Sequence, residues 1–196
     1  MKDLVEKVKA ELEPLRGFQR IKQISKATGH PVHLYGGFIR AIALGGKPKD
    51  VDLVSTAEGH REIRRGLLMQ EGDRSELVEK GLKAYRSKNA FGGDKFEMKG
   101  MEFDFWPIDN FGPLFQGAPL SSLPFTPPLV CNSVSLDIHS WELFTGDGIF
   151  DRFLEDRTLR TMRSSVADTL AFRAMNFSIR HNLRIVTGKQ LPGVYI

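Results

Sequence analysis

The feature that most limits the fold is a pair of glycines followed, after twelve intervening residues, by two closely spaced acids. Gly36 and Gly37 come directly after the apolar run 32–35, and Asp50 and Asp52 open the next apolar run. Alternate side chains of a β-strand point to one face, so these carboxylates would project together, about 6 to 7 Å apart along the chain. The pattern predicts a strand, a glycine turn, a short helix and a second strand with two acids on one face.

Two carboxylates on one face repel each other unless a cation lies between them. Mg²⁺ fits such a position because it prefers hard oxygen ligands and retains room for water and phosphate oxygens. In the alternative, one aspartate caps a turn after residues 47–49 and the other is solvated, since short patterns of this kind are common. The acid pair by itself leaves both a metal site and a surface turn open.

The glycine turn is the second informative feature. A turn without side chains, between a buried strand and the start of a helix, lets backbone N–H groups approach a phosphate. Arg40, on the first turn of that helix, could donate to the same phosphate oxygens. In the alternative, the glycines only supply a positive φ for a tight turn and Arg40 points to solvent.

Length and composition set outer limits. A chain of 196 residues has room for one core and a small helical appendage. No apolar run approaches the ~18 residues that span a bilayer, and the mixed charges of residues 1–15 do not form a secretion signal, so we expect a cytoplasmic protein with no membrane partner. Cys131, the single cysteine, excludes an intrachain disulfide and favours a buried packing role. The net charge of +4 suits a polyanionic partner without identifying one.

Hydrophobic periodicity predicts alternating helices and strands. Helical spacing indicates helices near 4–15, 18–27, 38–44, 58–70 and 166–181, the last with capping-box spacing from Ser165 to Asp168. Strand-like segments are 32–35, 50–54, 82–87, 95–98, 102–107 and 130–136, and a loop rich in Pro and Gly covers 110–128. This order predicts an α+β fold, in which helices flank a small mixed or antiparallel sheet and a helical segment follows.

The final helix carries two stripes. Its apolar stripe consists of Phe172, Met175, Ile179 and Leu183, and its polar stripe consists of Arg173, Asn176, Arg180 and, just beyond it, Arg184. The polar stripe either faces a nucleotide or RNA backbone or is a solvated helix face. His33 and His139 are expected to be hydrogen-bonded structural residues.

The stretch Gly36–Arg40 followed by Lys49–Leu53 resembles the first motif of the bacterial-type tRNA nucleotidyltransferase and poly(A) polymerase family, a branch of the DNA polymerase β-like nucleotidyltransferases. The separation of the glycines from the aspartates is the family's usual one. The resemblance implies a polymerase β-like nucleotidyltransferase head domain over 1–157, with N-terminal helices in 1–28, and a helical neck-like segment over 158–196.

Three later regions extend the resemblance. Residues 91–105 resemble the family's strand with the third carboxylate, for which Asp104 is the first choice and Glu102, on the same strand face, the substitute. Residues 132–137 resemble a family strand that begins at an asparagine, and 173–180 resemble the start of the helical neck. A surface strand with two acids is the alternative for Glu102 and Asp104.

The resemblance also implies a chemistry. ATP or CTP would donate a nucleotide to an acceptor hydroxyl, for which an RNA or tRNA 3′ end is one candidate, with release of pyrophosphate. It implies two Mg²⁺ ions, with Mn²⁺ as a substitute, bound by the catalytic acids Asp50, Asp52 and Asp104. The implied nucleotide-binding residues are Gly36, Gly37, Arg40, Lys49, Asn132, Asp168 and Arg173.

The sequence departs from the family where nucleotide and tRNA are recognised. Ala41 replaces an aspartate, residues 126–128 (Thr-Pro-Pro) replace an Arg-Arg-Asp run, and Ala171 replaces an arginine. A capping role for Asp168 is at least as good an interpretation as base recognition. No segment resembles the body and tail domains that hold tRNA. Three alternatives therefore stay open: nucleotidylation of a small molecule or protein, a non-catalytic nucleotide- or RNA-binding module, and a regulatory interaction protein.

Overall fold

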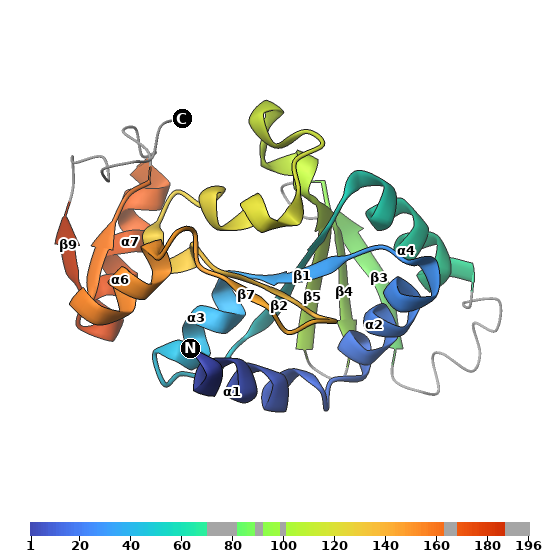
Figure 1. Cartoon of the computed structure of the whole chain (residues 1–196), viewed down its shortest axis with the longest axis horizontal. Helices are drawn as coiled ribbons and strands as arrows, with labels where there is room; N and C mark the ends of the chain where they lie inside the picture. The colour runs from blue at the N-terminus through green and yellow to red at the C-terminus, as the bar shows by residue number, and fades with distance from the viewer. Residues whose placement is uncertain (70–81, 89–91, 99–100, 163–167, 187–196) are drawn as a thin grey trace.

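The computed structural model describes residues 1–69, 82–88, 92–98, 101–162 and 168–186 (Figure 1). Its α-helices are α1 (Lys2–Leu12), α2 (Arg16–Thr28), α3 (Gly37–Ala43), α4 (Ala57–Met69), α6 (Ile149–Asp156) and α7 (Asp168–His181). Its strands are β1 (Val32–Tyr35), β2 (Asp50–Ser55), β3 (Leu82–Lys88), β4 (Asp94–Met98), β5 (Met101–Pro107), β6 (Ser135–Asp137), β7 (Leu143–Phe144), β8 (Thr158–Arg160) and β9 (Arg184–Val186). The 3₁₀ helices are η2 (Ile108–Phe111), η3 (Pro113–Phe115), η4 (Leu120–Phe125) and η5 (Val130–Asn132).

Seven of these strands form one mixed sheet in the order β3-β4-β5-β2-β1-β6-β7. Neighbouring strands are antiparallel except β2 and β5, which run parallel. Figure 1 shows α1 and α2 along one side of the sheet, and α6 and α7 grouped at one end of the molecule. The predicted α+β class and mixed sheet are confirmed.

The face of β2 and β5 that meets α2 forms the main core. Val51, Leu53, Phe103 and Phe105 alternate along the two strands and are fully buried. A Cβ added to Gly17 of α2 would lie 2.7 Å from the Phe103 ring, so the helix backbone packs directly on the sheet. This packing fixes the register of β2 against β5, because a slip of one residue would exchange the two faces.

The opposite face of β2 and β5 changes character along its length. It begins with acidic side chains at positions 50, 52, 102 and 104 and continues with Val54 and Trp106. These two apolar side chains join Tyr35 in a second buried cluster with residues of η2 and η4. The apolar cover therefore lies over the later part of the strands, and the acids lie at their beginning.

Two predicted segments differ from the structure. The strand predicted over 130–136 is wrong in its first half, because Val130–Asn132 is a 3₁₀ turn and only Ser135–Asp137 pairs in the sheet. The neighbours Val130 and Cys131 are both buried, which confirms the packing role of Cys131 and which a half-buried alternating strand does not permit. The segment 110–128 is more ordered than a loop, since 3₁₀ helices follow one another along it and Pro113 opens η3.

The C-terminal part also differs from a purely helical neck. β8 and β9 form a small parallel pair beside α7. The apolar stripe predicted on α7 is wrong in its centre, because Met175 and Ile179 are 55% and 76% exposed. Ala174 and Ser178 are buried instead, since their small side chains let α7 approach its neighbours closely.

Some predictions about this part stay untested. Ser165 and the predicted first turn of the last helix lie outside the described residues, and the domain boundary at residue 157 remains a prediction. In the described ranges, none of the helices combines the length and apolar character needed to cross a membrane.

Candidate functional site

The parallel pairing of β2 with β5 brings the predicted acids together. Asp52 lies directly opposite Asp104, and Asp50 lies directly opposite Glu102. Neighbouring strands are about 4.8 Å apart, and all four side chains belong to the same face of the sheet. Asp50 is exposed, whereas Asp52 and Asp104 are half-buried. The third acid chosen from the sequence is therefore the one beside Asp52.

The electrostatics of this face centre on Asp52. Burial raises the pKa of Asp52 to about 7, and the negative charges of Asp50 and Asp104 raise it further, while Arg40 and Lys95 act in the opposite direction. Within the described part of the chain, the side chains of Asp50 and Asp52 make no hydrogen bond. The two neighbouring acids thus destabilise the charged form of Asp52, and a bound cation would relieve that repulsion.

The donor set fits a hard divalent cation. Carboxylate oxygens are the ligands that Mg²⁺ and Mn²⁺ prefer. Among the described residues, no three acidic, histidine or cysteine side chains are gathered around one ion position as they stand. An ion shared by Asp50, Asp52 and Asp104 would therefore have to draw these side chains together, which their places on adjacent strands allow.

The glycine pair abuts the acids, and its members have different roles. Gly36 has φ +53° and its N–H donates to Val134 O at 3.0 Å, so this amide is engaged within the protein and its residue serves the turn. Gly37 begins α3, and a Cβ added there would lie 3.4 Å from Asp52 Oδ2 and 3.9 Å from Asp50 Oδ1. The missing side chain of Gly37 therefore leaves space directly beside the carboxylates.

Arg40 does not point freely into solvent. Its Nη1 donates a hydrogen bond to Asn132 Oδ1, which places the predicted residue Asn132 at the same site. Its Cζ lies 4.5 Å from the centre of the Phe177 ring on α7. Sequence reasoning missed Phe177, because a phenylalanine on an amphipathic helix ordinarily indicates core packing.

Lys95 is a second residue that the sequence did not reveal. It lies opposite Asp104 on the antiparallel pair β4–β5, and its Nζ is 2.9 Å from Glu102 Oε2. The hydrogen bond to Glu102 raises the pKa of Lys95, and the charges of Asp104, Glu102 and Asp50 act in the same direction. The closeness of the two strand segments in the sequence was a usable signal, because it indicates an antiparallel hairpin.

The structure leaves the other predicted residues outside this constellation. Lys49 is exposed immediately before β2. Asp168 and Arg173 lie on α7, where their side chains are outside the described residues. Asn176, Arg180 and Arg184 are exposed, in agreement with a solvated face. As predicted, His33 and His139 are hydrogen-bonded residues, with Ser135 and Ser25 as their respective partners.

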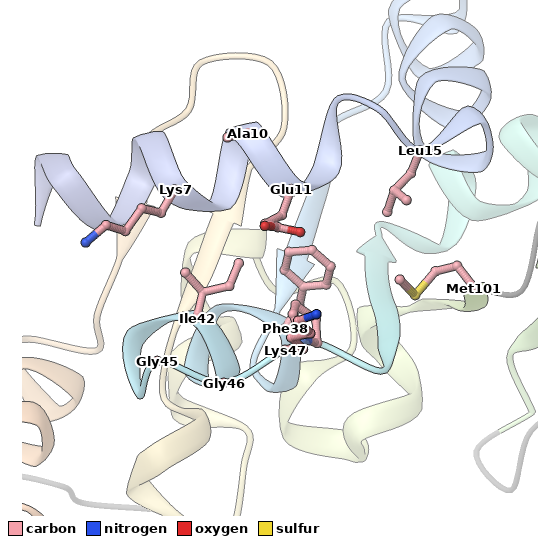
Figure 2. Close-up of a pocket in the computed structure, with 11 residues that line it drawn as sticks. Lys7, Ala10, Glu11, Leu15, Phe38, Ile42, Gly45, Gly46, Lys47 and Met101 are labelled. Carbon is pink, nitrogen blue, oxygen red and sulfur yellow. The ribbon is translucent and has the colours of Figure 1, made fainter.

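A cleft of about 590 Å³ lies elsewhere on the molecule (Figure 2). It runs between α1 and α3 and is lined by residues such as Lys7, Glu11, Phe38, Ile42 and Lys47. None of the predicted catalytic or nucleotide-binding residues lines this cleft. The carboxylate face and the cleft are therefore separate features.

The comparisons with known proteins agree with the geometry at the level of fold. No family model and no curated protein matches the sequence. A CCA-adding enzyme in complex with ATP has a TM-score of 0.67 at 19% identity, over 93% of this chain and 43% of that chain. A tRNA-processing enzyme in an apo form has a TM-score of 0.66 at 20% identity, over 89% of this chain and 44% of that chain.

A third similar structure is a tRNA nucleotidyltransferase complexed with a primer tRNA and an incoming ATP analogue, with a TM-score of 0.63 at 20% identity, over 85% of this chain and 46% of that chain. The fold is therefore of the nucleotidyltransferase type. More particularly, it is the fold of tRNA nucleotidyltransferases and CCA-adding enzymes, and the resemblance drawn from the sequence is confirmed to that extent. The chain spans less than half the length of these solved chains.

Proposed function

We propose that this chain is a metal-dependent nucleotidyltransferase that transfers a nucleotide from ATP or CTP to an acceptor hydroxyl and releases pyrophosphate. One observation supports this most strongly: Asp52 and Asp104 lie opposite each other on parallel strands, with Asp50 on the same face and the open space of Gly37 beside them. The similar solved structures include complexes with CTP, ATP and a primer tRNA, so an RNA 3′ end is the acceptor of first choice.

Asp50, Asp52 and Asp104 would hold Mg²⁺, or Mn²⁺ in its place. When bound there, the metal would lower the pKa of the attacking hydroxyl and neutralise charge on the phosphates. At pH values above its pKa, Asp52 supplies the central negative charge of this donor set. The roles of all three acids as metal ligands are part of the proposal.

The other residues of the site would bind and orient the nucleotide. Arg40 presents a planar guanidinium that can donate to two phosphate oxygens at once. The bare Cα of Gly37 lets phosphate oxygens approach the backbone beside the carboxylates. The acids lie on strands of a packed sheet, so the places of their backbones are set before the substrate binds. Most of the rate enhancement of such a reaction originates in this kind of positioning and in electrostatic stabilisation.

The test is pyrophosphate release from ATP and CTP in the presence of Mg²⁺, with RNA that ends in a free 3′ hydroxyl as acceptor. We expect release that requires both the metal and the hydroxyl, and that disappears in Asp50→Ala. RNA with a 3′-deoxy end is the matched control. Release at the same rate from Asp50→Ala or with the deoxy acceptor would overturn the proposal. If pyrophosphate is released only with a small-molecule or protein acceptor, the proposed reaction stands and the acceptor is not RNA.

One observation favours a second candidate, a nucleotide- or RNA-binding module without turnover. Thr126 stands where the resemblance calls for an Arg-Arg-Asp run, and it is only 3% exposed. Its Oγ1 lies 2.8 Å from the Tyr35 hydroxyl, so the position serves packing and not nucleotide contact. ATP binding without pyrophosphate release, across RNA, small-molecule and protein acceptors, would support the module over the enzyme.

A further inference from the structure

The guanidinium of Arg40 is held by two segments far apart in the sequence. Asn132 of η5 accepts a hydrogen bond from Nη1, and the Phe177 ring of α7 lies 4.5 Å from Cζ. Within the described part of the chain, Nε is buried without a hydrogen-bond partner. The remaining nitrogen, Nη2, is 4.0 Å from the place of a Cβ on Gly37. The Nη2 end of the guanidinium therefore lies beside the glycine turn.

Phe177 occupies a distinct place on α7. It is half-buried, and its ring centre is 4.5 Å from that of His181, one turn further along the helix. The buried neighbours Ala174 and Ser178 lie on the same side of α7, whereas Met175 and Ile179 face outward. Among the described side chains on this side of α7, Ala174 and Ser178 are small, and Phe177 is the ring that lies against Arg40.

We propose that Phe177 is a positioning residue for Arg40, through which α7 holds the guanidinium in the orientation that receives the phosphates of a nucleotide. This inference rests on the proposed function. An arginine side chain has several rotatable bonds, and a ligand that must order them binds less tightly. A flat aromatic ring under the guanidinium orders them beforehand, because stacking and cation–π attraction favour one orientation of the plane. Phe177 itself would not touch the nucleotide.

Phe177→Leu removes the ring and keeps an apolar side chain. We expect the dissociation constants of ATP and of inorganic tripolyphosphate, both with Mg²⁺, to rise about 3- to 10-fold. Adenosine binding should not change, because adenosine has no phosphate for Arg40 to meet. In the transfer reaction the KM for ATP should rise while kcat stays within about twofold. Phe177→Tyr keeps the ring and should restore wild-type values.

The decisive measurement is calorimetric titration of ATP and tripolyphosphate into wild type, Phe177→Leu, Arg40→Ala and the double variant. If Phe177 acts through Arg40, Phe177→Leu adds no further loss once Arg40 is alanine. A full additive loss would instead mean a general structural role and would overturn the inference. Urea unfolding identifies a variant that fails to fold, and Phe177→Met then replaces Phe177→Leu.

A second readout needs no ligand. In wild type and Phe177→Tyr, the ring should shift the NMR resonance of the Arg40 Nε–H, and in Phe177→Leu that shift should be lost. An Arg40 resonance that is identical in all three proteins would overturn the inference. If wild type binds ATP but Phe177→Leu binds it equally well, the positioning role alone fails. If wild type binds neither ATP nor tripolyphosphate, the proposed function fails and the positioning role fails with it.

Discussion

Two polar clusters lie on the same face of the sheet, one on β1 and β6 and the other on β2 and β5. The first cluster is internally satisfied. His33 Nδ1 lies 3.4 Å from Ser135 Oγ, and Asp137 Oδ1 accepts hydrogen bonds from the backbone N–H groups of His139 and Ser140 at 2.7 and 3.1 Å. The Asp137 carboxylate is therefore paired with backbone N–H donors, and the His33 ring is paired with a hydroxyl.

The second cluster is organised differently. The carboxylates of Asp50 and Asp52 accept no hydrogen bond from the described residues, and the charges that act on Asp52 include those of two further acids. Burial lowers the pKa of His33 to about 4 and raises that of Asp52 to about 7, so both neutral forms are favoured. Only at Asp52 do like charges add to the effect of burial. Polar groups that stabilise a fold are normally paired, whereas strained like charges on a rigid surface are typical of a ligand site.

The largest expected effect separates the two clusters by activity. Asp52→Asn should lower Mg²⁺-dependent pyrophosphate release at least about 1,000-fold, because it removes the central charge of the proposed donor set. The matched change Asp137→Asn should leave release within about threefold and reduce the free energy of unfolding by about 1 kcal/mol, because it weakens hydrogen bonds from backbone donors. Initial rates and urea unfolding give both values. Equal losses of activity in the two variants would contradict the assignment of a catalytic role to one cluster and a structural role to the other.

A second pair of variants tests the space beside the acids. Gly37→Ala should lower the rate about 10- to 100-fold, since its Cβ would lie 3.4 Å from Asp52 Oδ2 where phosphates are proposed to approach. Its stability should be unchanged, because alanine is favourable in a helix. Gly36→Ala should instead reduce the free energy of unfolding by about 1 to 2 kcal/mol, because φ is +53° there. A Gly37→Ala enzyme with full activity would show that the space is not used.

The pH dependence of stability should have opposite signs at the two clusters. The folded pKa of Asp52, about 7, lies above the ordinary value of 3.8, so this residue destabilises the fold increasingly as pH rises from about 4 to 7. The folded pKa of His33, about 4, lies below the ordinary value of 6.5, so its contribution to stability is present above pH 6.5 and is lost as pH falls toward 4.

Urea unfolding without metal can separate these two contributions. Asp52→Asn should exceed wild type in free energy of unfolding by about 1 to 3 kcal/mol at pH 8, with little difference at pH 4. Between pH 6.5 and 4, the free energy of unfolding should fall less in His33→Gln than in wild type. Parallel pH profiles of all three proteins would contradict both assignments.

Local sequence patterns predicted the elements that carry the site. The alternation in 50–54 and 102–107 indicated two strands, and the glycine pair indicated the turn before α3, because each pattern reflects a requirement within a few residues. The pairing that sets Asp104 opposite Asp52 is not local: only the resemblance grouped Asp104 with the aspartates of β2, and the parallel direction of the two strands was not predicted. The strand predicted at 130–136 failed in its first half because Val130 and Cys131 are both buried within a 3₁₀ turn, which an alternating pattern does not reveal.

The contact of Arg40 with Phe177 was beyond sequence reasoning for a similar reason. It depends on which face of α7 lies toward Arg40, and the apolar stripe that included Met175 and Ile179 indicated a different face. The small residues Ala174 and Ser178 decided the packing, although their hydrophobicity is low. The burial of Ala174 and Ser178 depends on how closely α7 fits against distant segments, and the sequence of one helix does not contain that information.

The smallest expected effect concerns the fourth acid on the carboxylate face. Glu102 shares this face with Asp104 but lies opposite Asp50, and its carboxylate is paired with Lys95 at 2.9 Å. Glu102→Gln should therefore change pyrophosphate release by less than about threefold, since an exposed ion pair contributes little. Asp104→Asn, the matched change two residues along the strand, should lower release at least about 100-fold. Comparable losses in the two variants would assign the third ligand to Glu102 and would place the metal nearer to Asp50, because the register leaves only these two acids of β5 beside the aspartates of β2.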